Sequence, residues 1–371
     1  WGSGESGCAM GAYYEERRGA FRQQETLTAL ILGDTRPGKE LHQLHNPGSV
    51  CSDGYGAILI ADTRNHRILR WVPGDIQAQV LAGKKGKGRG LDQLNSPEHV
   101  SVDSIGAMLI ADTRNHRILR WIPGASQGQV VAGGQAGKGD SLQQLNWPSS
   151  VISDGEKGVI VADFHNHRIV RWEEGAARGE VIAGGHGPGS GLHQLRSPSS
   201  VALDSEGGLL IADSRNHRVL HWSPGAPKGE IVAGGNGEGS ELEQLNLPEA
   251  VSLDPSGALL IADSRNHRVL RWPLGTGHGE VVAGGGSRGF GLGKLDWPTS
   301  AAFEASGLLL VADSQNHRII ASIPGTWADD EPEVPRPVRP NRVSRVDTSL
   351  ATAMLTDDRR SSSASGEPLL E

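Results

Sequence analysis

The sequence predicts an all-β protein, a six-bladed β-propeller made of four-stranded blades. The first observation is a segment, LIADTRNHRILRW at 59–71, which returns unchanged at 109–121 and in variant form four more times. The second is its spacing: the Asp of the segment recurs every 50 or 51 residues, and a fixed period of that length is typical of array architectures. The third is glycine, which supplies 52 of 371 residues, about twice the usual ~7%, as a chain rich in tight turns requires.

Each repeat contains four short apolar segments separated by turn residues. In the second copy, 97–133, HVSVD alternates, AMLIAD is almost wholly apolar, HRILRW alternates again and GQVVAG completes the set. A nearly continuous apolar run indicates a strand buried on both faces. The intervening DSIG, DTRNH and PGASQG carry the Asp, Asn and Gly that favour turns. Four short strands with glycine-rich turns are typical of one propeller blade.

The order of the strands predicts how the ring closes. Six sets of first-to-third strands are present, but only five fourth strands follow them. The segment TLTALILGD at 26–34 precedes the first blade and aligns with GQVVAGG, so we expect it to pair beside 317–322 and complete the sixth blade. Closure removes both open sheet edges. The sixth copy also has Ser322 where the other five have tryptophan: Trp71, Trp121, Trp172, Trp222 and Trp272.

Three regions are therefore expected. Residues 1–25 form an N-terminal segment that we expect to be irregular, and residues 26–325 form the propeller. Residues 326–371 are rich in Pro, Arg, Ser and Asp, show no periodicity, and are expected to form a disordered tail.

The repeated pattern [ILV]-A-D-x-x-N-H-R-[IV] resembles the NHL-repeat family of β-propellers, over about residues 26–325. The resemblance implies a binding propeller, and in tripartite-motif NHL proteins the propeller binds RNA through a basic face. Some related propellers are enzymes: peptide-amidating lyases hold zinc with three histidines near the channel, and sugar-lactone hydrolases use inward carboxylates and a divalent ion.

The Asp and His of the motif are expected to be structural. A zinc site needs three or four ligands around one ion, and six symmetry-related positions on a wide ring cannot converge. We expect each His to bond the Asp four positions before it, with no catalytic residue, metal or cofactor. The motif residues are Asp62, His66, Asp112, His116, Asp163, His167, Asp213, His217, Asp263, His267, Asp313 and His317.

Residues that enter the first strand of each blade are the expected lining of the central channel. They contain one histidine, His99, and two carboxylates, Glu98 and Glu249, which are too few for a calcium site of six to eight oxygens. A channel-centred metal-dependent lyase or hydrolase is thus the third function considered. The twelve positions are Gly48-Ser49, Glu98-His99, Ser149-Ser150, Ser199-Ser200, Glu249-Ala250 and Thr299-Ser300.

The most variable positions fall in two kinds of loop that emerge on one face. These are the turn after the motif Asp and the residue before each strand-one proline, where we expect solvent-reachable side chains (Asn46, Ser96, Trp147, Ser197, Leu247 and Trp297). Aromatic side chains beside arginine are the usual composition of protein-binding hot spots, although the Trp rings could instead pack onto their own loop. The candidate binding residues are Arg64, Arg114, Trp147, Phe164, His165, Arg215, Arg265 and Trp297.

Charge decides between classes of partner. The net charge is −7, and residues 26–325 hold 30 acidic and 27 basic side chains, so the body has no bulk field to hold a polyanion. We therefore expect a protein or peptide partner, with RNA as the alternative and no DNA binding. Two cysteines exclude zinc modules and a disulfide framework.

Targeting signals are not evident in the sequence. No apolar run approaches the ~18 residues of a membrane span. The chain begins with Trp1 and shows no secretory segment, so we expect a fragment or processed product, with the cytoplasm as the default location. Nothing in the sequence indicates an oligomeric state.

Overall fold

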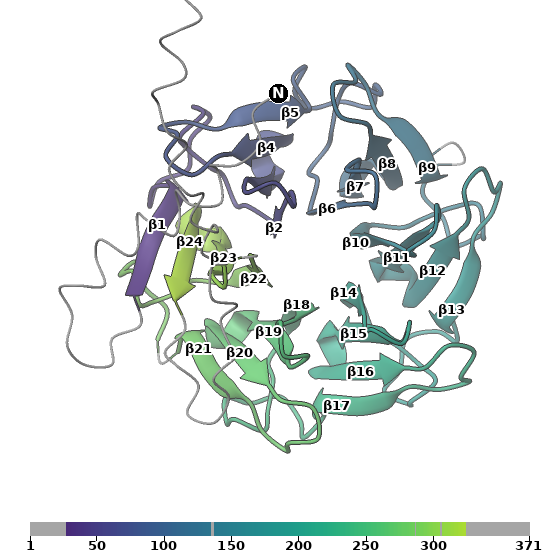
Figure 1. Ribbon diagram of the computed structural model, residues 1–371. Helices are drawn as coiled ribbons and strands as arrows, with labels where there is room; N and C mark the ends of the chain where they lie inside the picture. The colour runs from purple at the N-terminus through teal and green to yellow at the C-terminus, as the bar shows by residue number, and fades with distance from the viewer. Residues whose placement is uncertain (1–26, 135–136, 286, 305, 324–371) are drawn as a thin grey trace, which may run out of the picture. The chain divides into compact units, whose positions relative to one another are not determined.

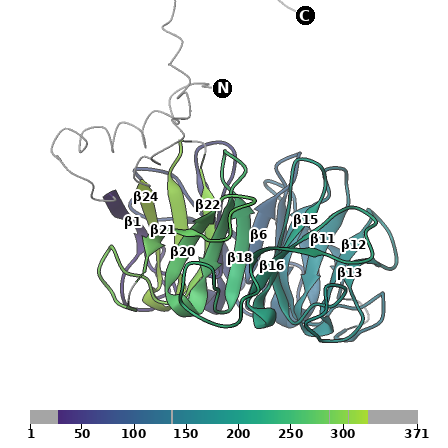
Figure 2. The ribbon, with the colours of Figure 1, turned by 90° about the horizontal axis from the view of Figure 1, so that it is seen from below.

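The computed structural model describes residues 27–323, apart from 135–136, 286 and 305. They form six four-stranded antiparallel sheets arranged around a central axis (Figures 1 and 2), which confirms the predicted six-bladed propeller. The expected irregular segment 1–25 and tail 326–371 lie outside the described residues. The helices among the described residues are three-residue 3-10 turns, none long or apolar enough to cross a membrane.

Five blades are continuous in the chain. Blade one contains β2 (Ser49–Ser52), β3 (Ile58–Asp62), β4 (Arg67–Trp71) and β5 (Gln79–Ala82). Blade two contains β6 (His99–Val102), β7 (Met108–Asp112), β8 (Arg117–Trp121) and β9 (Gln129–Gly133). Blade three contains β10 (Pro148–Ser153), β11 (Val159–Asp163), β12 (Arg168–Trp172) and β13 (Glu180–Gly184). Blade four contains β14 (Pro198–Leu203), β15 (Leu209–Asp213), β16 (Arg218–Trp222) and β17 (Glu230–Gly234). Blade five contains β18 (Pro248–Leu253), β19 (Leu259–Asp263), β20 (Arg268–Trp272) and β21 (Glu280–Gly284).

Blade six combines the two ends of the propeller. It contains β22 (Pro298–Phe303), β23 (Leu309–Asp313) and β24 (Arg318–Ile323), and its fourth strand is β1 (Leu27–Gly33). Strand β1 runs antiparallel to β24, with Leu27 opposite Ile323 and Gly33 opposite Arg318. The predicted closing strand is confirmed.

The exception at Ser322 follows from this closure. In the other five blades the tryptophan indole N–H donates to a carbonyl in the turn between the third and fourth strands, as Trp222 does to Ala226 at 2.8 Å. Blade six has no such turn, because its fourth strand comes from the other end of the propeller. Ser322 is instead buried against β1, with its hydroxyl 3.5 Å from that of Thr28.

The hydrophobic core lies between adjacent blades. The second strand of each blade is buried along its whole length, as its continuous apolar sequence predicts. In one seam, Leu59 and Ile68 of blade one pack with Ile110, Leu119 and Trp121 of blade two. The third-strand tryptophan thus fills the seam toward the preceding blade, and the seams hold the first strands around the axis (Figure 1).

The motif Asp organises the loop that leads into its own blade. The Oδ2 atom of Asp62 accepts from Arg67 Nε at 2.7 Å and Asn65 Nδ2 at 2.8 Å, and its Oδ1 atom accepts the His45 backbone N–H at 2.8 Å. Arg67 also donates to three backbone carbonyls of the same loop. Burial raises the pKa of the Asp62 carboxyl, and the Arg67 charge opposes that rise. The Asp–Asn and Asp–Arg pairs recur in all six blades.

The prediction that each His bonds the Asp four positions earlier is wrong. The Asp oxygens are already occupied, and each His adopts the left-handed conformation, as His66 does with φ 58°. Its Nδ1 atom accepts a backbone N–H from the loop that enters the next blade, Ser96 in the case of His66, at 2.9 Å. The same bond recurs around the ring, with His317 accepting from Asn46 and so joining the last blade to the first.

Candidate binding site at the mouth of the central channel

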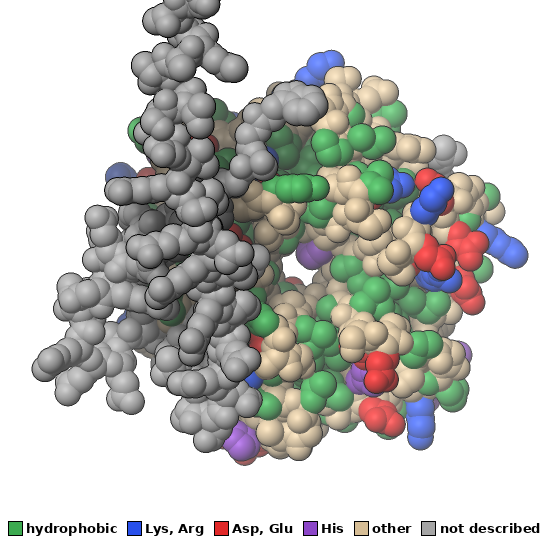
Figure 3. Space-filling view, in the orientation of Figure 1, with side chains coloured by type: hydrophobic (Ala, Val, Ile, Leu, Met, Phe, Trp, Pro, Cys, Tyr) green, Lys and Arg blue, Asp and Glu red, His purple; other side chains and the backbone are tan. Residues whose placement is uncertain are grey.

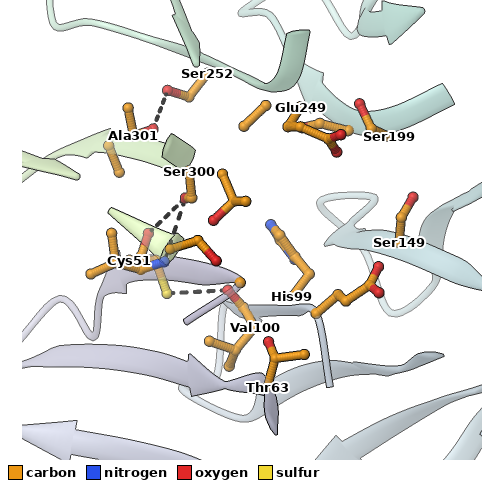
Figure 4. A pocket seen from close by; sticks show the side chains of 18 of the residues that line it. Cys51, Thr63, His99, Val100, Ser149, Ser199, Glu249, Ser252, Ser300 and Ala301 are labelled. Atoms are coloured by element: carbon orange, nitrogen blue, oxygen red, sulfur yellow. Dashed lines mark hydrogen bonds between the residues drawn. The ribbon is translucent and has the colours of Figure 1, made fainter. Parts of the chain in front are cut away.

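A cavity of about 490 Å³ lies along the axis of the propeller, between the first strands of the blades. Figure 3 shows the opening at the centre of the ring, and Figure 4 shows side chains from several blades that converge on it. The channel positions predicted from the sequence line this cavity, except Ser49 and Ser150, which are buried instead. The residue after each strand-one proline is called the channel ring below, and its six members are Gly48, Glu98, Ser149, Ser199, Glu249 and Thr299.

Two members of the channel ring are carboxylates, and they belong to opposite blades. Glu98 lies in blade two and Glu249 in blade five, three blades apart in a ring of six. Burial raises the pKa of Glu98 to about 8, and the negative charge of Glu249 adds to that rise. Burial also raises the pKa of Glu249 to about 7, against the positive charge of Arg215. The negative charge of Glu249 therefore acts on Glu98 across the channel.

His99 adds a neutral donor to the same cavity. Its ring points into the pocket (Figure 4), and its Nδ1 atom accepts the Val151 backbone N–H at 3.4 Å. Burial lowers the pKa of His99 to about 4, so the imidazole is neutral at neutral pH. Because Nδ1 serves as an acceptor, the single ring proton resides on Nε2.

Hydroxyl groups close the inner seam between blades. The carbonyl oxygen of each strand-one proline accepts a hydrogen bond from a hydroxyl of the preceding blade. That hydroxyl belongs either to the channel-ring residue or to the residue after the motif Asp. In blade three the channel-ring residue supplies it: Ser149 donates to Pro198 at 3.2 Å. In blade two the residue after the motif Asp does so: Thr113 donates to Pro148 at 2.9 Å. The remaining donors are Thr63, Ser199, Ser264 and Thr299.

This choice of donor explains which residues the channel ring tolerates. Blade three has Phe164 after its motif Asp, which carries no hydroxyl, and its channel ring supplies Ser149. Blades two and five carry Glu98 and Glu249 in the channel ring, and there Thr113 and Ser264 supply the hydroxyl. The two carboxylates are therefore not needed to close the seam.

The aromatic cluster predicted on blade three lies at the channel mouth. The Arg114 guanidinium lies over the Trp147 ring, 5.2 Å from its centroid. The Trp147 and His165 ring centroids are 5.6 Å apart, and those of Phe164 and His165 are 5.0 Å apart. The Trp147 indole N–H reaches into the channel and donates to Glu98 Oε1 at 3.2 Å. Trp147 is thus half-buried against blade two, and Arg114 and His165 are exposed.

The backbone explains why Trp147 projects there. Its φ is 61°, and its N–H donates to His116 Nδ1 at 3.1 Å. All six residues before the strand-one proline share this left-handed conformation. The expectation that all six are solvent-reachable is wrong for Ser96 and Ser197, which are 5% and 2% exposed. Their backbone is held inside the loop by the histidine, and a short side chain does not reach solvent as an indole does.

The other candidate residues are spread around the same mouth. Arg64 is exposed and lines the cavity, as does the half-buried Trp297 on blade six. Arg215 is exposed, and Arg265 forms an ion pair with Glu238 at 3.5 Å. Among the described residues, no three His, Cys, Asp or Glu side chains gather closely enough to hold a metal ion. The hydrogen bond between Trp147 and Glu98 was not predicted from the sequence. Its one signal there is that both positions carry a large residue where several other blades carry a small one.

Comparison with solved structures shows the fold. An auxiliary nutrient binding protein from Bacteroides thetaiotaomicron has a TM-score of 0.61 at 11% identity, over 81% of this chain and 76% of that one. A gluconolactonase from Xanthomonas campestris has a TM-score of 0.55 at 13% identity, over 82% of this chain and 98% of that one. A streptogramin B lyase has a TM-score of 0.51 at 11% identity, over 80% and 98%. At these identities the likeness concerns the propeller architecture alone.

Sequence comparison identifies the repeat. No curated protein matches the chain. The NHL repeat family matches at residues 195–222 and 245–272, which run from the loop before each first strand to the third-strand tryptophan of blades four and five. The same Asp, Asn, His and Arg occupy equivalent positions in all six blades. The chain is an NHL-repeat β-propeller.

Proposed function

We propose that the propeller is a non-enzymatic scaffold that binds a protein or peptide at its channel mouth. The observation that carries the proposal is the cluster of Trp147, Phe164, His165 and Arg114 on one side of that mouth. Tryptophan and arginine dominate protein-binding hot spots, where a few side chains supply most of the free energy of binding. The backbone of the cluster is held by hydrogen bonds, from the Trp147 N–H to His116 and from the His165 N–H to the Asn146 carbonyl, so a partner meets it without a large ordering cost.

RNA is the second candidate partner, and the exposed arginines around the channel mouth favour it. Arg64, Arg114 and Arg215 stand free of carboxylate ion pairs among the described residues. However, Arg265 is paired with Glu238, Arg114 covers the Trp147 face on which a base would stack, and two carboxylates occupy the channel below. Stacking on aromatic side chains is what single-stranded RNA recognition needs, so the geometry favours a protein partner.

Peptide selection on the full-length protein tests the proposal. Random twelve-residue peptides displayed on phage are selected on the immobilised chain, and the enriched peptides are synthesised and titrated by fluorescence anisotropy. We expect Trp147→Ala to weaken them by about 2 kcal/mol or more, roughly thirtyfold, as the loss of a hot-spot anchor does. Ile122→Ala is the matched control, because Ile122 is 52% exposed and lies on a turn at the opposite end of the strands.

RNA binding is measured on the same variants. Micromolar binding of a single-stranded RNA pool with a log–log salt slope of about −0.7 per phosphate, abolished by Arg114→Ala with Arg215→Ala and untouched by Trp147→Ala, contradicts the proposal. Peptides that bind the Trp147→Ala variant as tightly as the parent also contradict it.

A further inference from the structure

The channel carboxylates Glu98 and Glu249 are set apart from the rest of the fold. Neither one closes the inner seam, since Thr113 and Ser264 supply the hydroxyls of their blades. Within the described residues neither carboxylate forms an ion pair: the Glu98 side chain accepts one hydrogen bond, from the Trp147 indole, and the Glu249 side chain makes none. Carboxylates placed in a narrow channel lose hydration, and this loss costs free energy unless a partner replaces the water. Their blades could have carried serine, as blades three and four do.

The surroundings of the two carboxylates define what would fit between them. They face one another across the axis, because blades two and five are opposite. The wall is apolar at Val50, Val100 and Val251, and Trp147 and Trp297 stand at the mouth. An aliphatic stem that ends in a positive charge matches this sequence of surfaces, because such a stem packs on apolar and aromatic groups while its charged end seeks acceptors.

We infer that Glu98 and Glu249 seat the basic side chain, lysine or arginine, of a protein partner docked on the Trp147 cluster, an inference that rests on the proposed function. An ammonium or guanidinium carries three to five N–H donors and no acceptor, and the carboxylates of Glu98 and Glu249 offer acceptors on two sides of the channel. A calcium ion would need six to eight oxygens. The seat lies directly below the cluster, since the Trp147 indole bonds Glu98 itself.

Seating a cation couples binding to proton release. Glu98 faces Glu249, the positive charges of Arg64 and Arg114, and the Trp147 N–H, while Glu249 faces Arg215. The pKa of Glu98 is about 8 and that of Glu249 about 7. A bound cation favours the ionised forms and lowers both pKa values, so protons leave on binding. Affinity is therefore weak below pH 7 and levels off above pH 8.

The test uses the peptides selected on the full-length chain at pH 8.5. We expect each to contain a lysine or arginine whose replacement by norleucine or citrulline weakens binding at least tenfold. Glu98→Gln with Glu249→Gln should weaken the basic peptide to the same level and leave the norleucine or citrulline peptide unchanged. The basic peptide should bind at least tenfold more tightly at pH 8.5 than at pH 6.0, and a lysine-to-arginine exchange shows which head group is preferred.

A second double variant controls for net charge. Glu206→Gln with Glu230→Gln removes two carboxylates that are exposed and outside the channel, and it should leave every peptide affinity within twofold. Glutamine keeps an oxygen for the Trp147 N–H, so thermal melting should show both double variants folded. If the control weakens the basic peptide as much as the channel variant does, the attraction is general and the inference is wrong.

The remaining outcomes separate the inference from the proposed function. Peptides that need Trp147 but tolerate norleucine or citrulline overturn the cation seat and leave the proposed function standing. Failure to enrich any peptide that depends on Trp147 overturns both. Micromolar binding of spermidine or calcium chloride that the channel variant abolishes, with peptides indifferent to it, assigns the carboxylates to a small cation and overturns the peptide side chain.

Discussion

The motif Asp and His are identical in all six blades, whereas the residue of the channel ring changes from blade to blade. Each motif Asp bonds its Asn and Arg neighbours in every blade, and each motif His bonds the next blade. The channel ring holds one glycine, two serines, one threonine and two glutamates. The invariant motif groups form their hydrogen bonds within the protein, whereas a channel-ring position is free to vary where the residue after the motif Asp supplies the seam hydroxyl, as Thr113 and Ser264 do.

The largest effect should come from breaking the motif. Asp213 is fully buried, and it accepts from Arg218 at 2.8 Å, from Asn216 at 2.7 Å and from the Arg196 backbone N–H at 2.6 Å. Asp213→Ala leaves the buried Arg218 charge unpaired, which costs about 3–5 kcal/mol. Chemical denaturation of the full-length chain measures this loss in the free energy of unfolding.

A surface carboxylate of the same blade is the control. Glu206 is exposed, and Glu206→Ala should change the free energy of unfolding by less than about 0.5 kcal/mol. Equal stability of the Asp213→Ala variant and the parent would show that the motif Asp is dispensable for folding, and would remove the basis for calling the motif structural.

The sequence predicted the architecture because every blade obeys the same local rules. The motif Asp, the apolar second strands and the glycine-rich turns recur in all six blades. A strand that is unclear in one repeat can therefore be assigned by aligning that repeat with the others. Even the displaced strand β1 was visible as a missing fourth strand in blade six. Most of the channel lining was also predictable, because the first strand of each blade lies nearest the axis, although Ser49 and Ser150 are buried away from the cavity.

The partners of individual side chains were not predictable. The motif His lies four residues from the Asp, yet its left-handed backbone directs the ring to the next blade, 30 residues away in the chain. The bond between Trp147 and Glu98 spans 49 residues. Sequence spacing shows that two groups can be neighbours within a turn, but contacts between blades depend on how the seams pack.

A second prediction sharpens the contrast by titrating the channel ring. In the unfolded chain Glu98 loses its proton near its ordinary pKa of 4.5, whereas in the folded protein its pKa is about 8. The folded state therefore holds the proton over a range where the unfolded state does not, and stability falls as pH rises from about 5 to 8. Because one pKa unit corresponds to about 1.4 kcal/mol, the fall should be about 2–4 kcal/mol after allowance for water in the channel.

Glu98→Gln removes this titration. The variant should be as stable as the parent near pH 5 and more stable at pH 8, as measured by denaturant unfolding across that range. Glu206→Gln, on the exposed turn, should follow the parent at every pH. Parallel pH profiles for the parent and the Glu98→Gln variant would contradict the assignment of a raised pKa to Glu98.

The smallest effect concerns two channel-ring serines whose blades differ in the residue after the motif Asp. Ser149 and Ser199 both donate to a proline carbonyl of the next blade, at 3.2 and 3.0 Å. In the blade of Ser199 the residue after the motif Asp is Ser214. The equivalent residue of blade five, Ser264, donates to the proline carbonyl of the next blade. In the blade of Ser149 that residue is Phe164, whose side chain cannot donate a hydrogen bond. Ser149→Ala should therefore cost about 1 kcal/mol, and Ser199→Ala should cost less because Ser214 can replace the lost donor.

The double variant Ser149→Ala with Phe164→Ser completes the test. It restores a hydroxyl at the second position, so it should recover the proline hydrogen bond relative to a Ser149→Ala, Phe164→Ala pair of nearly equal size. Equal unfolding free energies for those two double variants would show that the two positions do not substitute for one another. Recovery would show that the inner seam needs one hydroxyl per blade and accepts it from either position. That freedom is what allows Glu98 and Glu249 to occupy the channel ring, and Phe164 to stand at its mouth, without loss of the fold.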